Sequence, residues 1–146
     1  MSAQWDARFL ELADLVASWS KDPSTKTGAV IVRPDRTIAS IGYNGFPRGL
    51  SDDVTYLRDR ETKYSRTVHC EMNAILSARE PLHGYTLYTV PFLSCDRCFV
   101  HVVQSGIKVV VAPRCTDPDK LSRWGAAFRT VRSMAKEAGV EVVELG

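Results

Sequence analysis

The sequence predicts one α/β domain built on a mixed five-stranded sheet, and two patterns carry that prediction. Near the N-terminus, apolar segments at residues 28–32 and 37–43 flank a Pro-Asp-Arg turn, as in a β-hairpin. In the second half, apolar segments at residues 85–90, 107–112 and 140–144 alternate with two helical segments. Such alternation favours parallel strands joined by right-handed crossovers.

The first helix is predicted from apolar residues spaced three and four apart. These residues are Trp5, Phe9, Leu12, Val16 and Trp19. Asp22 and Pro23 end this helix, and the two hairpin strands follow. Residues 44–63 then carry several glycine and proline residues and many charges. Because an unstructured connection of about 20 residues is usually functional, we expect a functional loop here.

Three further helices separate the remaining strands. The second helix is expected at residues 69–78, and the third at residues 95–104, where Gly106 ends it. Apolar positions between residues 121 and 135 predict the fourth helix, which Gly139 ends. No repeat, low-complexity segment or linker interrupts this order, so residues 1–146 are expected to form a single domain.

The composition narrows the class of protein. The chain has 146 residues, of which 45% are hydrophobic and 25% charged, values that fit a globular domain with a core. A net charge of +2 is too small for a dedicated nucleic-acid surface. The N-terminal residues lack signal-peptide features, and no apolar run approaches the roughly 18 residues that span a membrane. We therefore expect a cytoplasmic protein with reduced cysteines and neither nucleic acid nor membrane as partner.

Residues with metal and proton chemistry stand at the start of two predicted helices. Cys95 and Cys98 are three apart, so both thiols can project from the first turn of one helix. His69 and Glu71 are two residues apart, and both can reach a group near the start of the other predicted helix. Helix N-termini favour thiolates. Three ligands and one carboxylate indicate a zinc site with a position open for water, with Glu71 free to move a proton.

Two other interpretations of these cysteines are open. A closed structural zinc site needs a fourth protein ligand. The possible fourth ligands are Cys70, Cys115, His83 and His101. His101 is the most plausible of them because it falls three residues after Cys98 on the same predicted helix. A redox pair of Cys95 and Cys98 would leave His69 and Glu71 without a role.

The two motifs match H-x-E…P-C-x-x-C, the pattern of zinc nucleobase deaminases, except that Ser94 stands in place of the proline. Other segments narrow the resemblance. These are residues 22–32, 41–49, 51–53, 63–64 and 104–107. Together they resemble the deoxycytidylate (dCMP) deaminases over most of residues 22–112. After residue 112 the chain departs from that family, whose members often carry tyrosine and histidine there.

The resemblance implies a three-layer α/β/α cytidine-deaminase-like fold with helices on both faces of the sheet. It implies hydrolytic deamination of dCMP to dUMP and ammonia, with one Zn²⁺ held by His69, Cys95 and Cys98 and with Glu71 as the catalytic residue. The dUMP would supply thymidylate synthesis. Deamination of dCTP, or of another nucleoside or base on the same scaffold, is the alternative activity.

The resemblance also assigns residues to substrate binding. They are Asn44, Ser24, Lys26 and Cys70, the last through nearby backbone N–H groups. From residue chemistry alone, Asn44 before a glycine fits a turn equally well, and capping or solvation explains Ser24 and Lys26 nearly as well. Arg114 and Arg123 are candidates for the 5′-phosphate.

Regulation is a further implication, because many proteins of this kind form hexamers that dCTP activates and dTTP inhibits. The segment that carries the regulatory nucleotide there, with Mg²⁺ as a possible companion, corresponds to one loop of this chain. The residues assigned to it are Gly42, Tyr43, Gly45, Arg48, Asp52 and Asp53.

Overall fold

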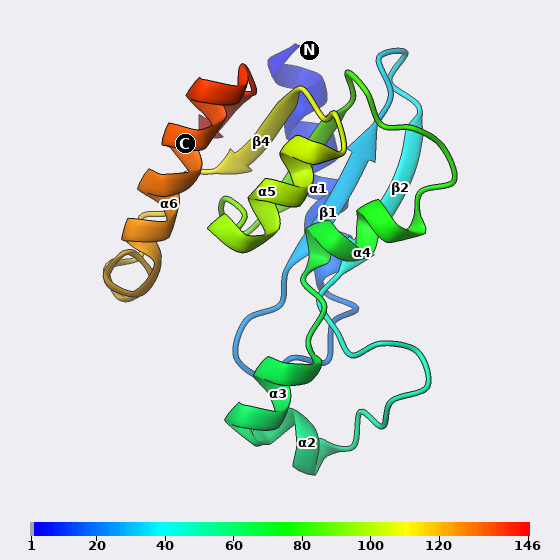
Figure 1. Cartoon of the computed structure of the whole chain (residues 1–146), viewed down its shortest axis with the longest axis vertical. Helices are drawn as coiled ribbons and strands as arrows, with labels where there is room; N and C mark the ends of the chain where they lie inside the picture. The colour runs from blue at the N-terminus through cyan, green and yellow to red at the C-terminus, as the bar shows by residue number, and fades with distance from the viewer. Residues whose placement is uncertain (1) are drawn as a thin grey trace.

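Five strands form one mixed sheet in the computed structural model of the protein, which describes residues 2–146 (Figure 1). The strands are β1 (Gly28–Val32), β2 (Ile38–Tyr43), β3 (Thr86–Val90), β4 (Val109–Pro113) and β5 (Glu141–Leu145). Their order is β2-β1-β3-β4-β5. β1 pairs antiparallel with β2 and β3, whereas β3, β4 and β5 pair in parallel. The predicted hairpin and the predicted parallel strands are both confirmed.

Helices cover both faces of this sheet, which confirms the predicted fold class. The four large ones are α1 (Ala3–Ala17), α4 (Cys70–Ser77), α5 (Asp96–Gln104) and α6 (Pro118–Ala138). Figure 1 shows α4, α5 and α6 in front of the sheet and α1 behind it. Side chains alternate along a strand, so Val30 of β1 packs in the α1 cluster while its neighbour Ile31 packs under the other helices.

Two short helices occupy the connection that we predicted to be a loop. They are α2 (Val54–Arg58) and α3 (Arg60–Arg66). Asp53 caps α2 by accepting from the Thr55 N–H, and Asp59 caps α3 by accepting from the Thr62 N–H. Neither helix has a buried residue, so neither carries the apolar periodicity that predicts a helix. The prediction of one unstructured loop was therefore wrong in this segment.

Other boundaries differ from prediction by a few residues. α1 ends at Ala17 with Ser18 as its C-cap, two residues before the predicted apolar position Trp19. Trp19, beyond the helix, instead makes an edge contact with the Tyr43 ring at 6.2 Å. α6 ends where predicted, at Gly139, whose φ of 75° suits glycine.

Close packing positions α4 against the sheet. A Cβ at Gly42 of β2 would overlap the Ala74 nitrogen and the Cys70 carbonyl oxygen of α4, so the approach requires glycine. Ser40, two residues earlier, donates to the Ala74 carbonyl at 2.6 Å. These contacts fix where α4 begins. Within residues 2–146, no helix combines the length and the apolar character needed to cross a membrane.

Candidate metal centre and catalytic cavity

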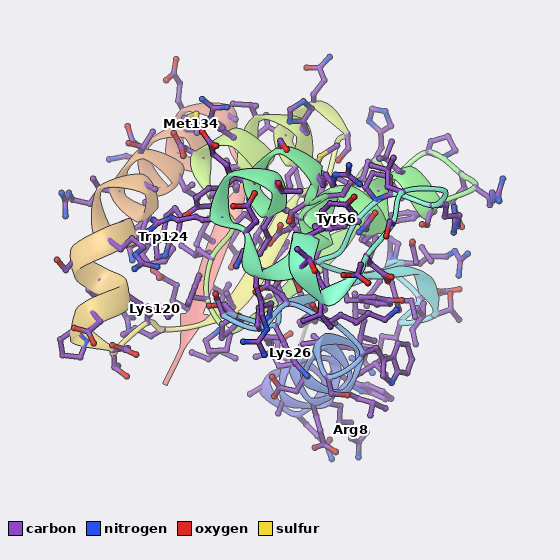
Figure 2. The ribbon with its side chains drawn as sticks, turned by 90° about the horizontal axis from the view of Figure 1, so that it is seen from below. Arg8, Lys26, Tyr56, Lys120, Trp124 and Met134 are labelled. Carbon is purple, nitrogen blue, oxygen red and sulfur yellow. The ribbon has the colours of Figure 1, made fainter. Side chains whose placement is uncertain are left out.

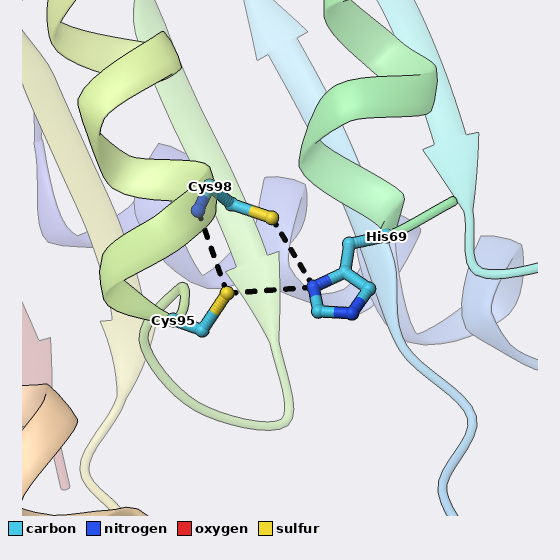
Figure 3. A group of neighbouring side chains, drawn as sticks. All are labelled: His69, Cys95 and Cys98. Atoms are coloured by element: carbon cyan, nitrogen blue, oxygen red, sulfur yellow. Dashed lines mark hydrogen bonds between the residues drawn. The ribbon is translucent and has the colours of Figure 1, made fainter. Parts of the chain in front are cut away.

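Three metal-ligand atoms meet where α4 and α5 begin. His69 is the N-cap of α4, Cys95 is the N-cap of α5, and Cys98 lies in the first turn of α5. The His69 Nδ1 atom lies 3.4 Å from Cys95 Sγ and 3.1 Å from Cys98 Sγ (Figure 3). Zinc with tetrahedral N and S ligands places such atoms about 3.5 Å apart. The donor set and its spacing therefore fit Zn²⁺.

Local electrostatics favour thiolate at this place. The Cys95 Sγ accepts from the Cys98 backbone N–H at 3.4 Å, at the positive end of α5. Hydrogen bonds from the Cys98 thiol and from His69 lower the pKa of Cys95 to about 4. The hydrogen bond to Cys95 and burial raise the pKa of Cys98. Without a metal ion the two sulfurs thus share one proton, which metal binding would displace.

The possible fourth ligands lie elsewhere. Within residues 2–146, His69, Cys95 and Cys98 are the one group of three such side chains whose ligand atoms converge. The His101 Nδ1 atom lies 2.9 Å from the Arg97 carbonyl oxygen on the exposed side of α5. The geometry therefore leaves the site with three protein ligands, as a catalytic zinc site requires.

Glu71 is buried beside these ligands and is held from the sheet. Its side chain is 5% exposed, and its Oε1 accepts from the Thr89 hydroxyl at 2.8 Å. The Thr89 Oγ1 also lies 3.7 Å from Cys70 Sγ. The single Thr89 hydrogen is donated to Glu71, so the Cys70 thiol is the donor in the second contact. Burial raises the pKa of Cys70, which keeps that thiol protonated.

Thr89 was not identified from the sequence. It lies on β3, whose five residues are all buried, and it is fully buried itself. A buried hydroxyl needs a hydrogen-bond partner, so a threonine in a wholly buried strand is the signal that could have found it. Its contact with Glu71 could not be inferred from the spacing of residues in the sequence.

A cavity of about 530 Å³ opens in front of the site. His69, Glu71 and Cys95 are among the residues that line it. The other walls come from the loop before β1, from α2 and α3, from the segment after β3 and from α6. This volume lies within the range of small-molecule sites, about 300–1,000 Å³. Two of the three candidate ligands, His69 and Cys95, and the Glu71 carboxylate thus face a space that can hold a nucleotide.

The residues assigned to substrate binding are placed differently from one another. Ser24 and Asn44 line the cavity, whereas Lys26 is exposed and is not part of its lining. Cys70 is 1% exposed and is not part of the lining, so its side chain does not face the cavity. Of the two arginines considered for a phosphate, Arg123 lines the cavity and Arg114 does not.

The Asn44 side chain holds the loop before β1. Its Oδ1 accepts from the Thr27 backbone N–H at 2.8 Å, and its Nδ2 donates to the Thr25 carbonyl at 2.9 Å. Asn44 is 6% exposed. It therefore shapes the wall that Ser24 and Thr25 present to the cavity.

Part of the loop assigned to regulation lines a second, smaller cavity of about 120 Å³. Tyr43, Gly45 and Asp52 belong to its lining, and Asp52 accepts from Lys21 Nζ at 2.6 Å. Three others of the assigned residues, Gly42, Arg48 and Asp53, lie outside it. The two cavities share one wall, made by Asp22, Asn44, Leu57 and Thr67.

Comparisons of the sequence give consistent matches. A profile described as "Cytidine and deoxycytidylate deaminase zinc-binding region" matches residues 3–113. A protein of Aliivibrio fischeri, described as an uncharacterized deaminase in the luxG 3′ region, is 45% identical over 99% of this chain and 96% of its own length. Human deoxycytidylate deaminase is 39% identical over 74% of this chain. The probable deoxycytidylate deaminase of Caenorhabditis elegans is 44% identical over 70% of it.

The chain is shorter than the last two relatives. The aligned region covers 64% of the human protein and 54% of the nematode protein. Among solved structures, the dCMP deaminase from the cyanophage S-TIM5, in complex with dCMP and dUMP, has a TM-score of 0.78 at 22% identity, over 99% of both chains. This likeness shows the same fold.

Replacement of Cys98 by alanine is expected to abolish zinc binding. Three ligands are present, and two ligands hold the ion far more weakly, so the zinc content should fall from about one ion per chain to near none. Elemental analysis of the purified variant measures this. His101→Ala is the matched control on the same helix and should retain zinc. Loss of zinc from the His101 variant would instead indicate a closed four-ligand site.

Proposed function

Because the chain belongs to the cytidine and deoxycytidylate deaminase family, we propose that it catalyses hydrolytic deamination of dCMP to dUMP and ammonia. The observation that carries the proposal is the convergence of three zinc-ligand atoms near a buried glutamate, with His69, Cys95 and Glu71 lining a nucleotide-sized cavity. The activity named for the human and nematode relatives supports dCMP as substrate.

His69, Cys95 and Cys98 would hold the metal. Two thiolates balance the charge of Zn²⁺, and the neutral imidazole adds none. When bound there, Zn²⁺ supplies Lewis-acid activation of a water molecule. The helix N-termini that carry these ligands stabilise the thiolates before any substrate enters.

Glu71 moves the protons of the reaction. Its carboxylate accepts a proton of the attacking water and passes it to ring N3. It then takes the proton of the new C4 hydroxyl and gives it to the departing amino group. The water oxygen forms the new bond to C4, the C4–N4 bond breaks, and ammonia leaves as dUMP forms. Thr89 holds Oε1 of Glu71, which orients the other carboxylate oxygen for these transfers.

The substrate is contacted by side chains of the cavity wall and by backbone N–H groups at the start of α4. Asn44 and Ser24 contact the nucleotide from the cavity wall, Asn44 also ordering the loop beside it. The first N–H groups of a helix have no partner within the helix, so those at Cys70 can receive the carbonyl oxygen of the base. Lys26 is assigned by resemblance and would have to reach the nucleotide from outside the lining.

The wider setting is proposed from the same resemblance. The protein works in the cytoplasm as a homo-hexamer, and its dUMP supplies thymidylate synthesis. The dCTP that activates it and the dTTP that inhibits it bind, with Mg²⁺, at the segment that lines the smaller cavity. Tyr43, Gly45 and Asp52 are its members in that lining.

Purified zinc-loaded protein is expected to release ammonia from dCMP and to lose this activity on chelation. Glu71→Gln should lower the turnover at least about 100-fold, because general acid–base catalysis contributes roughly that much, while zinc remains bound. Glu61→Gln, on the exposed side of α3, is the control and should leave turnover unchanged. CMP, dCTP and deoxycytidine serve as specificity substrates. No ammonia from dCMP, with preferential release from dCTP, would replace the proposed substrate by the triphosphate.

Thr89→Val should lower kcat for dCMP with little change in KM. Valine keeps the shape of threonine but cannot donate to Glu71, and a hydrogen bond to a charged group is worth roughly a tenfold to hundredfold effect. Thr89→Ser restores the hydroxyl and should restore kcat. Steady-state kinetics of the two variants decide the matter. A valine variant with the kcat of the unaltered protein would show that Glu71 needs no such donor.

Addition of dCTP with Mg²⁺ should shift the dCMP saturation curve to lower substrate concentrations, and dTTP should shift it to higher ones. The physical reason is that each effector binds one conformation of the protein better than another. Initial rates across a range of dCMP concentrations measure the shift. A saturation curve that neither nucleotide moves would remove regulation from the proposed function.

A further inference from the structure

One face of α6 forms a wall of the catalytic cavity. The residues of this face are Lys120, Arg123, Trp124, Ala127 and Phe128. Their spacing of three and four residues is that of a single helical stripe. Figure 2 shows Lys120 and Trp124 on the side of α6 that faces the rest of the molecule. The stripe is cationic toward the start of the helix and aromatic further along it.

The two ends of this stripe lie at different ends of the cavity. The Phe128 ring packs at 5.4 Å from the Phe92 ring, in the segment that leads to Cys95. Lys120 Nζ instead donates to the Thr25 hydroxyl at 2.8 Å, in the loop before β1. Eight residues of α-helix separate Lys120 from Phe128, about 12 Å along the axis. The cavity is thus apolar and aromatic near the metal ligands and cationic away from them.

The cationic end is not neutralised by the protein. Of the cations on the opposite wall, Lys63 pairs with Asp22 at 3.2 Å, and both side chains are largely buried. Within the described residues, Lys120 and Arg123 take part in no ion pair. Lys120 beside the Thr25 hydroxyl, and Arg123 three residues further along the same stripe, make a site for an anion that carries two negative charges.

We propose that Lys120 and Arg123 bind the 5′-phosphate of the substrate. The inference rests on the proposed function and deepens it. It makes α6, which lies beyond the residues matched by the family profile, the element that distinguishes nucleotides from nucleosides. The planar Arg123 guanidinium can hold two phosphate oxygens at once, and Lys120 adds a point charge. A base placed at the metal end then has its phosphate at the start of α6.

Calorimetric binding of dUMP and deoxyuridine to the zinc-loaded protein tests this without turnover. Arg123→Ala should raise the Kd for dUMP by about 10-fold to 100-fold, the range for a lost charged hydrogen bond, and leave the Kd for deoxyuridine unchanged. The Lys120→Ala/Arg123→Ala double variant should bind both ligands equally weakly. Lys136→Ala, an exposed cation late in α6, is the matched control and should behave as the unaltered protein. Thermal unfolding confirms that each variant is folded.

The outcomes separate the two proposals. Equal dUMP affinity in the double variant and the unaltered protein would overturn the phosphate assignment and direct it to Arg58 on the opposite wall. In kinetics, Arg123→Ala should raise KM for dCMP while kcat/KM for deoxycytidine stays the same. A protein that fails to deaminate dCMP but binds dUMP through Arg123 would refute the proposed reaction and retain the phosphate site.

Discussion

The site depends on the meeting of two helix N-termini. α4 carries His69 and Glu71 at its start, and α5 carries the two cysteines at its own. The position of α4 is set by its contact with β2, where Gly42 has no Cβ, and by the bridge between Gly45 and Val68 just before the helix. Because His69 and Glu71 stand on one turn, any displacement of α4 moves the proposed metal ligand and the proposed proton carrier together. Backbone packing therefore fixes the candidate metal site and the Glu71 carboxylate relative to each other.

Much of the fold was predictable because its elements are governed by local signals. The hairpin strands are apolar segments around a turn, and the later strands alternate with helices whose ends are marked by Gly106 and Gly139. α2 and α3 were not predictable in this way. They contain no fully buried residue and are held by the caps Asp53 and Asp59, so no apolar pattern distinguishes them from a charged loop.

The candidate site was predictable only for residues that lie close to one another in the sequence. His69, Glu71, Cys95 and Cys98 follow from two short motifs, because each pair lies within one turn of a helix start. The contact of Thr89 with Glu71 depends on how β3 lies under α4, which no sequence interval encodes. Likewise Trp124 and Phe128 were identified as apolar positions of a helix, but periodicity alone does not say whether such a face packs on a sheet or lines a cavity.

The shared wall of the two cavities has a thermodynamic consequence. Asp22, Asn44, Leu57 and Thr67 face both spaces, and Asn44 also holds the loop that carries Ser24 and Thr25. A molecule in the smaller cavity that favours one position of this wall changes the binding free energy of a ligand in the larger cavity. Linkage makes that change reciprocal, so the occupant of the larger cavity alters the affinity of the smaller by the same factor. A few side chains between two spaces are thus enough to connect two binding equilibria.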